Sequence, residues 1–161
     1  MDRALDSLSS DCKPVVIEVL ARLVERQIAV LIVQTSRTVS EQQANLINGT
    51  SHLRLSKHLP RKLRHLRTGG PDDEKADAID LCPYALYQLH GPRKLAWSAI
   101  DPAWRVIGDV GELLGLRWGG RWTCADLGHL EWLFPEERYA DIPTSSAAWV
   151  HHGIAAAGAH N

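Results

Sequence analysis

Apolar residues recur with a helical period in two segments of this chain. Residues 11–27 place valine and leucine at positions i, i+3 and i+4, with glutamate and arginine on the opposite face, which predicts an amphipathic helix. Residues 101–115 repeat the pattern after an Asp-Pro start that is typical of a helix N-terminus. A third helix is predicted over 39–48, because serine and threonine precede Glu-Gln at its start and Asn-Gly follows its end.

Four further segments are short and rich in β-branched or alternating apolar residues, which favours strands. They are residues 28–34, 76–82, 116–122 (a strand followed by a turn) and 128–134. Alternation in the last segment places His129 and Glu131 on one face and Leu130 on the other. We expect a loop over 84–98 and a loosely ordered tail over 135–161, where alanine, glycine and histidine show no period.

Length and composition fit one globular domain. The chain has 161 residues, 45% of them apolar and 23% charged, with a formal net charge of -1, so a dominant role in nucleic-acid binding is disfavoured. The three cysteines show no CxxC spacing, which argues against a disulfide framework or a zinc ribbon. We expect a single domain over 1–134, made in a reducing cytoplasm without a signal peptide or a membrane-spanning segment.

Lysine, arginine and histidine are dense between positions 52 and 67. The run comprises His52, Arg54, Lys57, His58, Arg61, Lys62, Arg64, His65 and Arg67. Such a run is usually a solvated face, and that is the first interpretation here. The alternative is a surface that attracts an anionic polymer of the cell wall or outer membrane. Residues 68–74, which follow, have the composition of an exposed loop.

Three places in the sequence carry candidate metal ligands. They are Ser56-Lys57-His58, Asp77-Ala78-Ile79-Asp80 and Asp126-Leu127-Gly128-His129. A catalytic zinc needs three histidine or carboxylate ligands and one open position, and His58, Asp80 and His129 would supply them. Asp126 is placed to take a proton from water activated by the metal. A scattered set of this kind also occurs by chance, and Asp80 in its apolar strand is equally compatible with a buried salt bridge.

The order of several short motifs adds to this hypothesis. The motifs are Ser36-Arg37-Thr38, Asn48-Gly49-Thr50-Ser51, Ser56-Lys57-His58, Ala78-Ile79-Asp80, Trp118-Gly119-Gly120 and Asp126-Leu127-Gly128-His129. In this order they resemble the M15 zinc peptidases, which include D-alanyl-D-alanine carboxypeptidases and phage L-alanyl-D-glutamate endopeptidases. The resemblance covers about residues 12–134 and is greatest to the phage lysis enzymes.

The resemblance implies a role for each matched residue. The zinc ligands are matched by His58, Asp80 and His129. Asp126 matches the catalytic acid/base carboxylate. Arg37 matches an arginine near the substrate, where a guanidinium could pair with a peptide carboxylate or polarise the scissile carbonyl. Gln42 matches a position that supports the loop of this arginine, and Ser56 matches a small polar residue near the site.

The sequence departs from the family pattern in two places. His58 and Asp80 are 22 residues apart, which implies an insertion at about 60–75 that could be a basic flap or a surface-binding hairpin. The insertion also offers His65 as an alternative ligand, although Ser-Lys precedes His58 and not His65. Arg121 stands where related sequences often have aspartate after Gly-Gly. Neither departure removes a matched ligand or the acid/base carboxylate.

The resemblance also implies a fold and a function. The fold is α+β, with a small, mostly antiparallel sheet and helices packed on one side, as in DD-peptidases and hedgehog domains. The function is zinc-dependent hydrolysis of the L-alanyl-D-glutamate bond in bacterial peptidoglycan. Alternatives are a D-alanyl-D-alanine carboxypeptidase and an inactive wall-binding module. We expect a monomer that binds neither nucleic acid nor membrane, and that is held in the host cytoplasm until phage lysis exposes the periplasmic wall.

Overall fold

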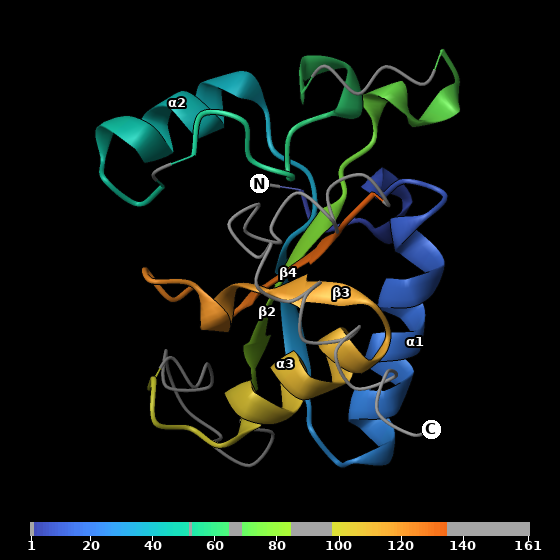
Figure 1. The fold of residues 1–161 in the computed structure, drawn as a ribbon, viewed down its shortest axis with the longest axis vertical. Coiled ribbons are helices and arrows are strands. Elements are labelled where there is room, and N and C mark those ends of the chain that lie inside the picture. The colour runs from blue at the N-terminus through green and yellow to red at the C-terminus, as the bar shows by residue number, and fades with distance from the viewer. Residues whose placement is uncertain (1, 52, 65–68, 85–97, 135–161) are drawn as a thin grey trace, which may run out of the picture.

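The computed structural model describes residues 2–51, 53–64, 69–84 and 98–134. The predicted tail over 135–161 and nearly all of the predicted loop over 84–98 therefore lie outside the described residues. The fold is α+β, as predicted, and is built around one four-stranded sheet (Figure 1). No helix among the described segments combines the length and the apolar character needed to cross a membrane.

The sheet is antiparallel throughout, and its spatial order is β1-β2-β4-β3. The strands are β1 (Val30–Gln34), β2 (Ala78–Pro83), β3 (Leu116–Trp118) and β4 (His129–Trp132). Three of the four lie within the segments that sequence periodicity predicts, and β2 extends one residue beyond its predicted end at residue 82. The central pair, β2 and β4, carries apolar residues toward the core and polar residues toward the opposite face, because side chains alternate along a strand. Ile79 and Leu130, paired across these strands, are fully buried.

Two of the three predicted helices cover the apolar face. Helix α1 (Cys12–Glu25) buries Val16, Val19 and Leu23, while Val24, predicted on the same stripe, is exposed. Helix α3 (Ala103–Leu113) follows Asp101, whose carboxylate accepts the Ala103 N–H at 2.8 Å, as expected of a residue at a helix start. Both helices contribute to one hydrophobic core with the inner face of the sheet.

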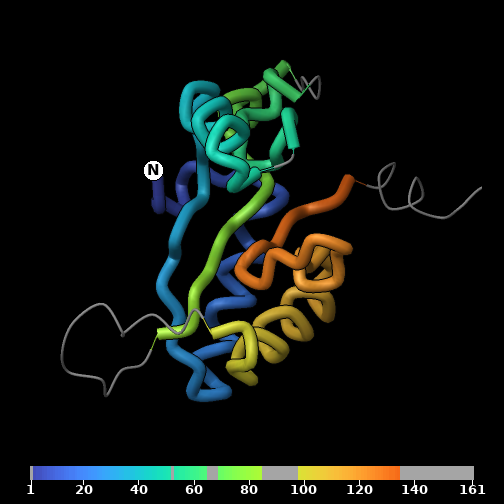
Figure 2. The backbone as a smooth tube through the Cα atoms, turned by 90° about the vertical axis from the view of Figure 1, so that its left-hand side faces the viewer, coloured from blue at the N-terminus to red at the C-terminus, as the bar shows by residue number. Residues whose placement is uncertain are grey.

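The third helix, α2 (Val39–Ile47), lies at the other end of the molecule from α3 (Figures 1 and 2). Its predicted start is confirmed: the Thr38 side chain accepts the Glu41 N–H, and the Glu41 carboxylate accepts the Thr38 N–H, which is a capping box. Only Gln42 is buried in this helix. Helix α2 therefore does not share the layer of α1 and α3, and none of its residues belongs to their hydrophobic core.

The basic segment differs from its first interpretation. It contains a short 3-10 helix, η2 (Arg61–Arg64), and the predicted loop that follows contains a second one, η3 (Pro71–Glu74). Arg61 and Arg64 are only 2% and 7% exposed. The solvated-face prediction is therefore wrong for these residues, because acidic partners from distant segments bury them in ion pairs.

Candidate metal centre

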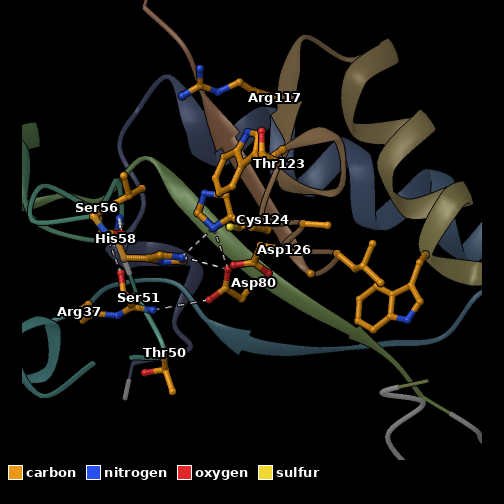
Figure 3. A pocket seen from close by; sticks show the side chains of 17 residues that line it. Arg37, Thr50, Ser51, Ser56, His58, Asp80, Arg117, Thr123, Cys124 and Asp126 are labelled. Atoms are coloured by element: carbon orange, nitrogen blue, oxygen red, sulfur yellow. Dashed lines mark hydrogen bonds and ion pairs between the residues drawn. The ribbon is translucent and has the colours of Figure 1, made fainter. Parts of the chain in front are cut away.

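Strand register brings the predicted ligands together. Asp80 on β2 lies directly opposite His129 on β4, and His58 reaches the pair from the loop before η2. The Asp80 Oδ1 atom lies 3.0 Å from both His58 Nε2 and His129 Nδ1, and the two nitrogen atoms are 3.2 Å apart (Figure 3). These three side chains form a cluster able to hold a metal ion.

The outer nitrogen of each histidine has an acceptor of its own. His58 Nδ1 lies 2.7 Å from the Thr35 carbonyl oxygen, and His129 Nε2 lies 3.0 Å from Glu131 Oε2. A carbonyl or an ionised carboxylate only accepts, so each outer nitrogen donates its proton and the inner nitrogen keeps a lone pair. Three electron-pair donors then face one point. The donor set fits a cation such as Zn²⁺, for which two imidazoles and a carboxylate are ordinary ligands.

Asp80 and His129 shift each other's pKa values. Burial disfavours the Asp80 carboxylate, but the charges and hydrogen bonds of His58 and His129 outweigh it and hold the Asp80 pKa well below its usual value. Burial also opposes charge on His129, yet Asp80 and Glu131 raise its pKa to about 10. A proton and a metal ion therefore compete for the same lone pairs of the cluster.

Arg37 approaches the cluster from the side of α2. Its Nη2 atom lies 3.8 Å from Asp80 Oδ2. Its guanidinium also donates to Gln34 Oε1 at 3.0 and 2.5 Å and to Gln42 Oε1 at 2.7 Å. Gln42 in turn donates to the Ser51 hydroxyl at 3.0 Å. The structure thus places Gln42 behind Arg37, where it fixes the guanidinium, and not against the metal cluster.

A β-bulge in β1 explains the position of Gln34. The register shifts between Ile32 and Gln34, so that Gln34 lies opposite Asp80. Bulges re-aim side chains next to functional sites. Gln34, Asp80 and His129 thereby form one row across three strands. Sequence reasoning missed Gln34, since the only signal is its place at the end of a strand.

Asp126 lines the pocket and lies beside Asp80 (Figure 3). The backbone turn that carries it packs against Gly119: a Cβ there would come within 2.6 Å of the Asp126 carbonyl oxygen and 3.1 Å of His129 Cβ. Glycine is therefore required at this position of the Trp-Gly-Gly motif. Partial enclosure by the pocket walls, helped by the Asp80 charge, raises the Asp126 pKa above its usual value. A carboxyl group in this state suits proton transfer.

The cluster opens into a pocket with a volume of about 810 Å³. Ser56 lines it and accepts the His58 N–H at 3.3 Å, so it shapes the turn that presents the histidine. Trp122, another lining residue, lies with its ring centroid 5.1 Å from that of His129. Arg117, also in the lining, donates to Glu131 Oε1 at 2.7 Å. The pocket thus surrounds the cluster with both cationic and aromatic groups.

Several supporting residues escaped sequence reasoning. Alternation along β4 places Glu131 on the face of His129, so this partner could have been found. The Thr35 carbonyl could not, because every residue carries one. Arg121 pairs with Glu112 on α3 at 2.5 Å. His65, the alternative ligand, lies outside the described residues.

Comparisons with known proteins find the similarity that the sequence motifs indicate. Residues 75–132 match the M15 family model described as D-alanyl-D-alanine carboxypeptidase. The L-alanyl-D-glutamate peptidase of Escherichia phage T5 is 35% identical over 105 residues, which cover 62% of this chain and 64% of that protein. The chain therefore spans just under two thirds of the length of this relative.

A solved structure agrees on the fold. The L-Ala D-Glu endopeptidase ChiX of Serratia marcescens superposes with a TM-score of 0.55 at 18% identity, over 82% of this chain and 85% of that one. At this identity the likeness concerns the fold alone. The matched segment includes Asp80 and His129, and the fold places His58 against both. Part of the chain is thus similar in sequence to an M15 family model and to a phage peptidase, and its fold is similar to that of an L-Ala D-Glu endopeptidase.

Proposed function

We propose that this protein is a zinc-dependent peptidase that hydrolyses the L-alanyl-D-glutamate bond in the stem peptides of bacterial peptidoglycan. The observation that carries the proposal is the convergence of His58 Nε2, His129 Nδ1 and Asp80 Oδ1 within 3.2 Å of one another at the base of an open pocket. These residues would be the metal ligands. The name of the phage relative supports the choice of bond.

Asp126 and Arg37 would each have a role in the reaction. A bound Zn²⁺ would supply Lewis acidity that acidifies water and polarises the peptide carbonyl. Asp126 accepts the proton released when water adds to the carbonyl carbon, and it returns this proton to the leaving amine as the C–N bond breaks. Arg37, held by Gln34 and Gln42, faces the same point and would orient the substrate or stabilise the developing oxyanion.

D-alanyl-D-alanine carboxypeptidase activity is the second candidate. The description of the matching family model favours it, and the same residues would perform it, since the chemistry at the carbonyl is identical. An inactive wall-binding module is disfavoured because Asp126 and the complete ligand set are present. The two activities differ in their products.

Product analysis tests the proposal. Purified peptidoglycan is incubated with the zinc-loaded protein, and new amino groups and free amino acids are identified. We expect new D-glutamate amino termini with the wild type and none with Asp126→Ala, which should still bind zinc. Free D-alanine instead would indicate the carboxypeptidase, and an unchanged wall would contradict both activities.

We also propose a setting for this activity. The phage relative suggests a role in host lysis, in which the enzyme waits in the host cytoplasm and reaches the periplasmic wall once the membrane is opened. Peptidoglycan would be its only macromolecular partner, and the protein would act as a monomer without binding nucleic acid or membrane. Sedimentation of the purified protein with and without cell walls tests these expectations.

A further inference from the structure

Two buried arginines, Arg61 and Arg64, lie between His58 and Asp80 in the sequence and have no role in the proposed reaction. Arg61 donates to the two Asp77 carboxylate oxygens, from Nε at 2.9 Å and from Nη2 at 2.8 Å. Arg64 Nη2 donates to the same carboxylate at 2.5 Å. Asp77 is fully buried. We call Arg61, Arg64 and Asp77 the arginine clasp.

The clasp joins segments that are far apart in the sequence. Near the N-terminus, the Ser9 hydroxyl donates to Asp77 Oδ1 at 2.5 Å, and Asp11 Oδ2 accepts from Arg61 Nη2 at 2.7 Å. After β4, the Phe134 ring lies against the Arg61 guanidinium, with the Arg61 Cζ atom 4.6 Å from the centroid of the ring. These contacts enclose and neutralise the arginines, so this part of the basic run is not a surface for an anionic polymer.

Asp77 connects the clasp to the first proposed ligand. Its carboxylate holds Arg61, while its backbone N–H donates to the Lys57 carbonyl oxygen at 2.9 Å. Lys57 directly precedes His58, and its Nζ atom donates to the Trp132 carbonyl oxygen at 2.9 Å. Trp132 N–H donates back to the Asp77 carbonyl oxygen at 2.8 Å. One residue therefore ties the loop of His58 to both central strands.

We propose that Arg61 is a positioning residue for the metal centre, acting through Asp77 on the loop that presents His58. A buried carboxylate that loses its partner must move or admit water. Either response displaces the backbone N–H that holds Lys57, and His58 moves with it. Ligands held slightly out of place bind metal more weakly. This inference rests on the proposed function, because it requires the cluster to bind zinc.

The test compares two neighbouring cations of η2. Arg61→Lys keeps the charge but loses the planar fork that contacts both carboxylate oxygens. Lys62→Met is the matched control, since Lys62 pairs with Glu74 at the surface. The zinc Kd is measured by competition with a chelator, and ligand geometry by the absorption spectrum of the Co²⁺-loaded protein. We expect Arg61→Lys to weaken zinc binding by about tenfold and to alter the cobalt spectrum. Lys62→Met should do neither.

The possible outcomes separate this inference from the proposed function. A wild-type Kd and cobalt spectrum in folded Arg61→Lys would overturn the positioning role, even if urea denaturation showed a loss of stability. If Arg61→Lys does not fold, Asp11→Asn is used instead. This change removes the charge of one carboxylate that pairs with Arg61 and should weaken zinc binding by roughly threefold. An unchanged Kd in that variant would also overturn the inference. Failure of the wild type to bind zinc would instead refute the proposed function.

Discussion

At the scale of single residues, the site depends on partners that fix which nitrogen of each histidine faces the cluster. Glu131 is 2% exposed and divides its two oxygens between His129 and Arg117. The Thr35 carbonyl oxygen accepts the outer N–H of His58 in the same way. Such outer partners raise ligand basicity and restrict ring rotation, so they affect metal affinity without touching the metal.

Replacing Glu131 tests this role. Glu131→Gln removes the charge opposite His129 Nε2 while keeping the shape of the side chain. We expect zinc binding to weaken by about tenfold, measured by chelator competition. Glu18→Gln is the matched control, because Glu18 pairs with Arg22 on the exposed side of α1. Equal zinc affinity in the two variants would show that Glu131 does not support His129.

Sequence alone predicts the residues that meet in the site but not what holds them. Periodicity places Asp80 and His129 on two predicted strands, and the motif order adds His58, Asp126 and Arg37. That these two strands are neighbours is known only from the structure. The burial of Arg61 could not be predicted, because it depends on Asp11, which is 50 positions away. Local composition reports only that arginine is charged, so a basic run is interpreted as a solvated face until its long-range partners are known.

At the scale of elements, α2 supports the site through its N-terminus. The capping box of Thr38 and Glu41 begins the helix, and one turn later Gln42 accepts from Arg37. We expect Thr38→Ala to lower the free energy of unfolding by about 1 kcal/mol, measured by urea denaturation. Because the change also loosens Gln42, the rate of peptide hydrolysis should fall. Unchanged stability and rate would show that the capping box does not fix Arg37.

Asp77, which directly precedes β2, makes folding stability sensitive to acid. Burial disfavours the Asp77 carboxylate, but hydrogen bonds from Arg61, Ser9 and Arg64 outweigh this and lower its pKa below 3.8. A group with a lowered pKa in the folded state stabilises the fold fully above its unfolded pKa, and this stabilisation is lost as the pH falls through the folded value.

We therefore expect the free energy of unfolding to decline as the pH is lowered below about 4. Asp77→Asn should lower stability at pH 7 by about 3 kcal/mol and should show a smaller decline in acid. Urea denaturation at a series of pH values measures both. An identical acid response in the wild type and the variant would contradict the role given to Asp77.

At the scale of the whole molecule, the proposed ligands come from segments that only the folded chain brings together. His58 lies in a loop, and Asp80 and His129 lie on the two central strands. An ion that binds the folded chain and not the unfolded one stabilises the fold. Zinc at about one hundred times its Kd should add about 2.7 kcal/mol, which raises Tm by roughly 5–10 °C in a chain of this size. His129→Ala should show no such increase, and a similar increase in both proteins would place the zinc elsewhere.

The most direct test of the account is the metal dependence of bond cleavage. Purified peptidoglycan is treated with the wild-type protein before metal removal, after removal with a chelator, and after one equivalent of zinc is restored, and D-glutamate amino termini are counted. We predict that these termini appear, cease to form when zinc is removed, and form again when it returns. Termini that continue to form after complete metal removal, or none in the presence of zinc, would contradict a zinc peptidase built on His58, Asp80 and His129.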